Sequence, residues 1–285
     1  IPYILDYRDS WFANPYLPDR GSVLQYLHRR QEVAALTSAA GVVFVNPGLE
    51  EHYQKTYEFV TGKKVETVRN GYDPEDLQHR ERFQRSEELS VFRLGILGSV
   101  YSQGNAPETL LRAVSMLKQQ DTPHINNLRL VFLGKWTEKF YQSLKNFHHP
   151  ELLDLHEYLP HREALAFADS LDALALAIHS HLEGSRQVTP GRIYEYLYLR
   201  KPVLAMCPLD GDLANLVREC QAGEVCDYHD VAGISEILKN WLNLQSPVQK
   251  YYEFECLEQF DRRILTQKMM AFVRTVLASE YTTPV

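Results

Sequence analysis

Two side chains of opposite charge, Arg192 and Glu195, lie three residues apart in the segment 187–206. Residues at this spacing share one face of a helix. Thr189 can cap the start of such a helix, and Pro190 suits its first position, where a missing N–H costs nothing. The positive helix end, the Arg192 cation and the Glu195 acceptor predict binding of a phosphate and a sugar hydroxyl. The alternative is a solvated surface pair, since capped helices are common in α/β proteins.

The apolar residues around this pair indicate which elements position it. Ile193 and Leu197 lie four residues apart on the other helical face and can pack on a sheet. Pro202 would end the helix near Leu199. Residues 203–206 then have the pattern of a short buried strand. The segment is therefore predicted to be the loop, helix and strand of a βαβ unit.

Residues 190–205 also resemble a known motif. They read P-G-R-I-Y-E-Y-L-Y-L-R-K-P-V-L-A and are similar to P-x-K-x-x-E-Y-x-A-x-G-x-P-V-L-A of GT-B fold glycosyltransferases, specifically the family 4 (group 1) type. In that family the Glu binds the ribose of the nucleotide-sugar donor and the basic residue binds its diphosphate. The resemblance implies these roles for Glu195 and Arg192. Arg in place of Lys keeps the charge and adds a bidentate fork. Residues 198–201 depart from the family, whose helix ends in a small residue and Gly.

The composition is that of an ordinary globular protein. Of the 285 residues, 45% are hydrophobic and 24% charged, and the formal net charge is −7. This acidic balance argues against a nucleic-acid partner, which needs clustered Lys and Arg. The cysteines form no C-x-x-C pair and lack zinc-ligand spacing, which favours a reducing, cytoplasmic location. They are Cys207, Cys220, Cys226 and Cys256.

The start of the chain and its apolar runs bear on membrane contact. No apolar run reaches membrane-spanning length, and no signal peptide is present. The chain begins at Ile1, without a Met, on an apolar stretch typical of a central strand. We therefore expect residues before Ile1 to be missing, and this chain alone to bind a ligand but to have little enzymatic activity. Contact between such a missing part and a membrane surface stays open.

Residues 1–72 are predicted to form the second half of an N-terminal, acceptor-side Rossmann-like domain. Their apolar periodicity alternates between short buried strands and amphipathic helices. Asn46-Pro47-Gly48 is expected as a turn into a helix. Strands are predicted at 1–7, 41–45 and 65–68, and helices at 23–40 and 49–60.

Two stretches of this half resemble family 4 enzymes as well. Residues 5–11, L-D-Y-R-D-S-W, are like D-x-R-D-x-W, and residues 70–74, N-G-Y-D-P, are like the N-G-x-D where that family crosses between domains. Arg8 and Asp9 are expected at a strand's carboxyl end, where α/β sheets bind ligands. Asp9 is thus a candidate near the acceptor or transferred sugar. The alternative, slightly favoured, is a buried Arg8–Asp9 pair that ties loop to sheet.

A linker is predicted at 73–90, followed by a complete donor-binding domain at 91–255. Strands alternating with helices imply a parallel sheet covered on both faces. The whole chain is therefore expected to be an α/β, GT-B-like protein with two Rossmann-like domains. Residues 256–285 are expected to form a C-terminal helix that braces the first domain, as in the family; the alternative is a cap on the last sheet.

Several loops are expected at the carboxyl edge of the second sheet. The Gly98–Ser99 turn can bring backbone N–H groups to a phosphate. The family has a Lys in the following loop, which this sequence lacks, and Lys135 is a candidate substitute. Tyr158 falls where the family holds the base. Zinc-type ligation is not predicted, because His179, His181 and Glu183 on one loop would make a thin site and GT-B enzymes generally need no metal.

The predicted function is transfer of a glycosyl unit from a nucleotide-diphosphate sugar to an unknown acceptor hydroxyl. The resemblance implies retention, no metal and no further cofactor. The family's first Glu, which touches the donor sugar, corresponds to Glu183 if the loop carries an insertion, or to Gln187. The alternatives are a non-catalytic nucleotide-sugar-binding module and another Rossmann-type enzyme, although no G-x-G-x-x-G follows a strand. The candidate catalytic residues are Arg192, Glu183 and Asp9, and the candidate donor-binding residues are Gly98, Ser99, Lys135, Tyr158, Gln187, Thr189, Gly191, Arg192 and Glu195.

Overall fold

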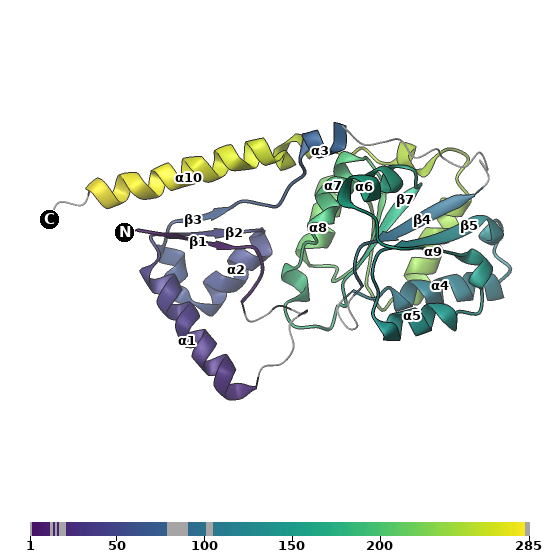
Figure 1. Cartoon of the computed structure of the whole chain (residues 1–285), viewed down its shortest axis with the longest axis horizontal. Helices are drawn as coiled ribbons and strands as arrows, with labels where there is room; N and C mark the ends of the chain where they lie inside the picture. Colours follow the sequence, from purple (N-terminus) through teal and green to yellow (C-terminus); the bar gives the residue numbers. More distant parts are fainter. Residues whose placement is uncertain are drawn as a thin grey trace.

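The computed structural model describes residues 2–11, 14, 16, 21–78, 91–100 and 105–282. The described strands form two separate parallel sheets, one of three strands and one of six. Each sheet is the centre of one lobe, and the lobes lie side by side along the long axis (Figure 1). We call the part around the three-stranded sheet the first lobe and the part around the six-stranded sheet the second lobe. The fold class is therefore the predicted one, α/β with parallel sheets.

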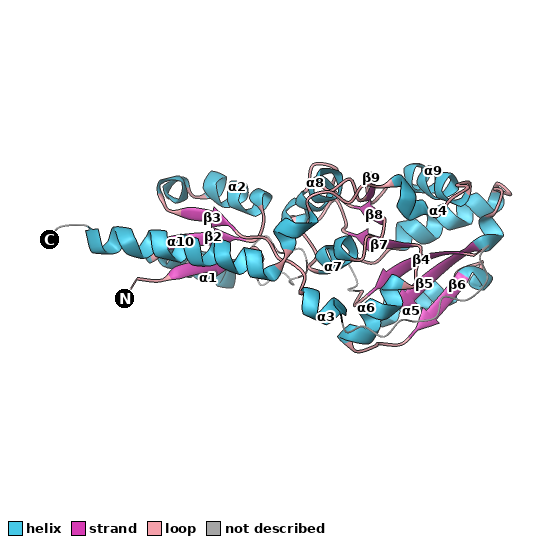
Figure 2. Cartoon of the chain, turned by 90° about the horizontal axis from the view of Figure 1, so that it is seen from above, coloured by secondary structure: helices cyan, strands magenta, loops and turns pink. Residues whose placement is uncertain are grey.

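The first lobe has the strand order β1-β2-β3. Alternate residues of a strand point to opposite faces, and β2 is buried on both. Val42 and Phe44 pack beneath the helices on one face, whereas Val43 packs against Phe272 and Val276 of α10 on the other. Figure 2 shows α10 lying along these strands. The elements are β1 (Ile4–Tyr7), α1 (Ser22–Ser38), β2 (Gly41–Phe44), α2 (Pro47–Thr56), η1 (Glu58–Gly62), β3 (Val65–Thr67) and α10 (Arg262–Thr282).

The second lobe has the strand order β6-β5-β4-β7-β8-β9, with every neighbouring pair parallel. Chain order runs outward in one direction from β4 to β6 and in the other from β7 to β9. The order therefore reverses between β4 and β7, and such a switch point is where open α/β sheets bind ligands. The strands are β4 (Phe92–Leu97), β5 (Leu128–Leu133), β6 (Leu153–His156), β7 (Ala173–Ala177), β8 (Val203–Met206) and β9 (Gly223–Cys226).

Helices cover both faces of this sheet, because the strands are apolar on both sides. One core joins the sheet to α4, α5 and α9, and a second joins it to α6, α7 and α8. The helices are α4 (Glu108–Gln119), α5 (Glu138–Lys145), α6 (His161–Asp169), α7 (Arg192–Tyr198), α8 (Asp212–Glu219) and α9 (Val231–Leu242), with short 3₁₀ turns η2 (Ile125–Asn127), η3 (Pro150–Leu152), η4 (Ser185–Gln187), η5 (Val248–Tyr251) and η6 (Leu257–Phe260).

The chain crosses between the lobes at two places that touch each other. The Tyr72 N–H donates to the Phe260 carbonyl at 3.0 Å, and the Arg262 N–H donates to the Tyr72 carbonyl at 3.1 Å. A Cβ on Gly71 would lie 2.1 Å from the Phe260 oxygen. The glycine of the N-G-Y-D-P stretch is therefore required by close backbone approach.

Two boundaries differ from the sequence prediction. The stretch predicted as a linker contains the short helix α3 (Pro74–Gln78), and residues 79–90 lie outside the described part. The last helix begins at Arg262 rather than at residue 256, because Cys256 has a φ value of 57°, which interrupts a helix. In the described part of the chain, no helix is both long and apolar enough to cross a membrane.

Candidate functional site

A cavity of about 320 Å³ lies at the switch point of the second sheet and is closed on its other side by the first lobe. We call it the interlobe cavity. The first lobe contributes side chains that follow β1 and β3. The second contributes the carboxyl ends of β4 and β7 and the segment before α7. The lining residues are Arg8, Asp9, Tyr16, Asn70, Ile96, Ser99, Val100, Asn105, Ala175, Leu176, Ala177, Val188, Thr189, Pro190, Gly191 and Arg192.

Arg192 supplies an unneutralised positive charge to this cavity. It is the first residue of α7, and its half-buried side chain forms no hydrogen bond or ion pair with any residue that the structure describes. Its guanidinium lies against Gly98, where an added Cβ would be 2.5 Å from Arg192 Nη1. Because α7 has only seven residues, its dipole is weak, and Arg192 is the main attraction for an anion.

The turn after β4 forms the wall beside Arg192. Gly98 has φ +94°, a conformation that glycine adopts without strain. Its N–H donates to the Leu133 carbonyl at 2.7 Å, and the Ser99 carbonyl accepts from Asn105 Nδ2 at 2.8 Å. Ser99 faces the cavity. Residues 101–104 of this predicted loop lie outside the described part.

Thr189 does not cap α7, which corrects the sequence prediction. The helix begins at Arg192, its N-cap residue is Gly191, and no side chain caps it. The Thr189 hydroxyl instead accepts a hydrogen bond from Asn46 Nδ2 of the first lobe at 3.3 Å. The sequence could not reveal this partner, because Asn46 lies 143 residues away in the chain. Thr189 and Gly191 nevertheless both line the interlobe cavity.

Glu195 lies on the next turn of α7, outside the cavity lining. One of its oxygens is 2.8 Å from His161 Nε2, and its side chain is 21% exposed. His161 is the first residue of α6 and is itself exposed. The carboxylate therefore stands at an accessible edge, neither in the apolar interior nor free in bulk water. The described geometry leaves it able to accept from a ligand hydroxyl.

Lys135 and Tyr158 pair with each other away from the cavity. The Lys135 ammonium lies 5.1 Å from the centre of the Tyr158 ring, a cation–π distance. Tyr158 is 62% exposed, and neither residue lines the interlobe cavity. A phosphate-binding role for Lys135 would require it to leave this ring.

Glu183 and Gln187 are also separated from Arg192 in this structure. Glu183 lines a different cavity, of about 540 Å³, with residues of α1 and α2. Gln187 contributes its backbone carbonyl, which accepts from Asn46 Nδ2 at 2.7 Å. In that second cavity burial raises the pKa of Glu32, whose carboxylate accepts from the hydroxyls of Tyr53 and Tyr57.

The predicted Arg8–Asp9 pair is wrong. Arg8 is paired with Asp6 at 2.8 Å and donates to the Val68 carbonyl at 3.0 Å, because the β1 end and the β3 end are neighbours across β2. Asp9 is left to line the cavity. Its carboxyl is exposed to the cavity, yet the surrounding walls displace enough water to raise its pKa.

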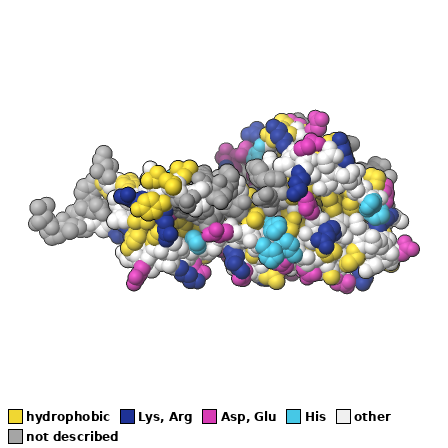
Figure 3. Space-filling view, turned by 90° about the horizontal axis from the view of Figure 1, so that it is seen from below, with side chains coloured by type: hydrophobic (Ala, Val, Ile, Leu, Met, Phe, Trp, Pro, Cys, Tyr) yellow, Lys and Arg dark blue, Asp and Glu magenta, His cyan; other side chains and the backbone are white. Residues whose placement is uncertain are grey.

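Three histidines form a cluster that follows the carboxyl ends of β7 and β9. The rings of His181 and His229 stack at 4.2 Å, and that of His179 lies 4.5 Å from His229. Figure 3 shows histidine side chains gathered on the second lobe. Burial, then the neighbouring His229 and His181, lower the pKa of His179. Within the described residues, no group of three or more potential ligands is arranged to hold a metal ion.

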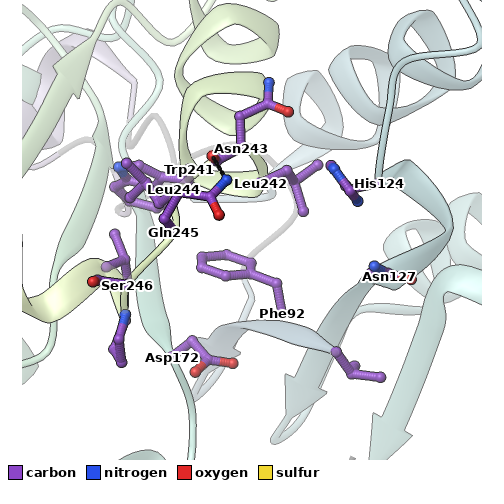
Figure 4. A pocket seen from close by; sticks show the side chains of 13 residues that line it. Phe92, His124, Asn127, Asp172, Trp241, Leu242, Asn243, Leu244, Gln245 and Ser246 are labelled. Atoms are coloured by element: carbon purple, nitrogen blue, oxygen red, sulfur yellow. Dashed lines mark hydrogen bonds between the residues drawn. The ribbon is translucent and has the colours of Figure 1, made fainter. Parts of the chain in front are cut away.

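A further cavity, of about 450 Å³, lies at the opposite, amino edge of the second sheet. Figure 4 shows Phe92, Asn127 and Asp172 at its base and Trp241 and Gln245 above. None of the predicted site residues lines it. The interlobe cavity is therefore the place where the structure brings several of them together: Asp9, Ser99, Thr189, Gly191 and Arg192, with Gly98 against the last.

No family model matches this sequence, and no curated protein matches it significantly. Solved structures do match the fold. Sucrose-phosphate synthase from Thermosynechococcus elongatus is 13% identical with a TM-score of 0.68, over 97% of this chain and 68% of its own. WaaG, a glycosyltransferase involved in lipopolysaccharide biosynthesis, is 14% identical with a TM-score of 0.62, over 93% and 74%. TarM from S. aureus, solved with UDP, is 11% identical with a TM-score of 0.63, over 86% and 46%.

These similarities establish the fold. The arrangement of two lobes with parallel sheets is that of GT-B glycosyltransferases. The chain spans between about half and three quarters of the length of these three structures.

Proposed function

We propose that this chain binds a nucleotide-diphosphate sugar in the interlobe cavity and transfers the sugar to an acceptor hydroxyl, as a family 4 type glycosyltransferase. The observation that carries the proposal is Arg192, an unpaired cation in a cavity at the switch point of a nucleotide-binding type of sheet. The GT-B fold and the UDP bound by TarM support it. Retention of configuration and independence of metal are proposed from the sequence resemblance.

In this proposal Arg192 stabilises the negative charge that collects on the leaving diphosphate. A hydrogen bond to a charged group contributes about 1.5–3 kcal/mol, whereas catalysis generally requires at least about 8 kcal/mol. Positioning within a closed cavity has to supply the difference. The Gly98–Ser99 turn, Thr189 and Gly191 would contact the phosphates and sugar, and Asp9 would face the reacting groups from the first lobe.

Glu195 is proposed to hold the ribose hydroxyls, since it lies one turn beyond Arg192 at an accessible edge. Glu183, Gln187, Lys135 and Tyr158 lie outside the cavity lining, and donor contacts through them would require rearrangement. We also propose a cytoplasmic location, because all four cysteines are unpaired.

A non-catalytic nucleotide-sugar-binding module is the second candidate. The position of Lys135 favours it, because Lys135 is directed to Tyr158. Among the described residues that line the cavity, the other cation, Arg8, is paired with Asp6. Release of nucleoside diphosphate from a panel of UDP-, GDP- and ADP-sugars distinguishes the two: a transferase turns over, and the module only binds.

Calorimetric titration with UDP, GDP and ADP tests the site itself. For the nucleotide that binds most tightly, Arg192→Ala is expected to raise the Kd by about 10- to 100-fold, which corresponds to the loss of one charge-assisted hydrogen bond. Arg186→Ala is the matched control, because Arg186 is exposed and pairs with Asp210 outside the cavity. Equal nucleotide affinity of the Arg192→Ala and wild-type proteins would show that the phosphate-binding role of Arg192 is wrong. Binding of NAD more tightly than UDP, GDP and ADP would favour another Rossmann-type enzyme.

A further inference from the structure

The side chain of Asn46 joins the two lobes beside the interlobe cavity. It is 2% exposed and lies two residues after the end of β2. Its Oδ1 accepts from the Leu49 N–H at 2.8 Å and so caps α2. Its Nδ2 donates to the Gln187 carbonyl at 2.7 Å and to Thr189 Oγ1 at 3.3 Å. All the hydrogen-bonding groups of one amide are thus divided between a helix cap in the first lobe and a loop of the second.

A second contact lies two residues further along α2. The Gly48 N–H donates to Asp212 Oδ1 at 3.0 Å, and Asp212 is the first residue of α8. A Cβ on Gly48 would lie 2.3 Å from Asp212 Oδ2, so a larger residue would displace the Asp212 carboxylate. Figure 1 shows α2 as the helix of the first lobe that faces α8.

The loop that Asn46 holds forms part of the cavity wall. Val188 and Thr189 line the cavity, and the chain continues through Pro190 and Gly191 to Arg192. Whatever fixes this loop to the first lobe therefore also fixes where Arg192 stands relative to Asp9 across the cavity.

We propose that Asn46 is a positioning residue that clasps the segment 187–189 to the first lobe and holds the interlobe cavity closed during sugar transfer. The inference rests on the proposed function, and it adds a residue for which the sequence indicated only a turn. Without the clasp the nucleotide still binds to the second lobe through Arg192, but the reacting groups of the two lobes are no longer aligned.

Asn46→Asp separates the clasp from the helix cap. Asp caps a helix as well as Asn does, so α2 is retained. The carboxylate has no N–H to donate, and it places a negative charge against the Gln187 carbonyl. Asp230→Asn is the matched control, because Asp230 caps α9 by accepting from the Gly233 N–H and does not line the interlobe cavity.

Two measurements on the full chain decide the proposal. The first is the distance between spin labels on cysteines placed at Lys55 and Lys139, in a background with Cys256→Ser; the other three cysteines are buried. Asn46→Asp is expected to broaden and lengthen this distance, and Asp230→Asn to leave it as in wild type. An unchanged distance in Asn46→Asp overturns the clasp, whether or not the chain proves to be a glycosyltransferase.

The second measurement separates binding from turnover. With Asn46→Asp, the turnover number for nucleotide sugar is expected to fall about 10- to 100-fold, the loss typical of misaligned reacting groups, while the Kd of UDP or GDP stays within about threefold. A wider distance with unchanged turnover overturns the positioning role. A wild-type chain without turnover contradicts the proposed function instead, and the distance measurement still decides the clasp.

Discussion

Glu195 and His161 share one short contact, at 2.8 Å, between the first turns of α7 and α6. A ribose hydroxyl that approached Glu195 would donate to the carboxylate, as the imidazole N–H of His161 does. The carboxylate has lone pairs for both. The Glu195 side chain is therefore suited to distinguish ribose from deoxyribose while it keeps its contact with His161.

We predict that Glu195→Ala reduces the preference for UDP over 2′-deoxy-UDP by about tenfold, since a hydrogen bond to a charged acceptor contributes about 1.5–3 kcal/mol. Calorimetry with both nucleotides measures the ratio. Glu183→Ala, in the separate cavity, serves as the control. The ribose role would be disproved by a ratio that stays the same in Glu195→Ala.

Asp212 gives the chain a pH dependence of known sign. Burial raises the pKa of its carboxyl to about 6, although the Gly48 N–H opposes the shift, and Oδ2 has no hydrogen-bond partner. Between about pH 4 and 6 the folded state therefore holds a proton that the unfolded state has released. This group makes the free energy of unfolding decrease as pH rises through that window.

Asp212→Asn is expected to reduce this slope, to which the raised pKa values of Asp9 and Glu32 also contribute, and to raise the free energy of unfolding at pH 8 by about 1–3 kcal/mol. The amide keeps an oxygen for the Gly48 N–H without the buried charge. Urea titrations at pH 4.5 and pH 8 measure both effects. A slope of the same size in the variant and the wild type would show that Asp212 is not the titrating group.

At the scale of elements, the close backbone approach at Gly71 fixes the position at which α10 begins. A methyl group there would meet the Phe260 carbonyl at 2.1 Å. We expect Gly71→Ala to lower the free energy of unfolding by about 1–3 kcal/mol, as overpacking does. Gly62→Ala is the control, because nothing lies within 4 Å of its added Cβ. Thermal melts of the two variants side by side provide the test, and equal melting temperatures would contradict the prediction.

The sequence predicted a helix or strand correctly where the apolar pattern of its own residues determines the element. The order of strands and helices in the second lobe follows from apolar runs such as 128–133, and the GT-B-like class follows from that alternation. The start of α7 was missed because Thr189 satisfies its hydroxyl with Asn46, far away in the chain. The Val68 carbonyl was missed as a partner of Arg8 for the same reason, since it becomes a neighbour only once β1 and β3 flank β2. The charged partner of Arg8 is local, but it is Asp6 rather than the predicted Asp9.

At the scale of the whole molecule, the last helix completes the core of the first lobe. Phe272 and Val276 of α10 are 7% and 2% exposed and pack on Val43 and Val68. Phe272→Ala is expected to destabilise the first lobe by about 3–5 kcal/mol and to leave the second lobe nearly unchanged. Hydrogen exchange resolved by peptide tests this, with Met270→Ala, 46% exposed on the same helix, as the control. Equal loss of protection in both lobes would show that they unfold as one unit.

The position of α10 also dictates when the first lobe can become stable. One face of its sheet is covered by residues 262–282. These residues leave the ribosome only after the entire second lobe has been synthesised. Nascent chains generally fold their domains in order of emergence, but here one face of β2 and β3 is covered only after the second lobe has emerged. Until then Val43 and Val68 present a bare apolar surface, the kind that chaperones shelter and that drives aggregation.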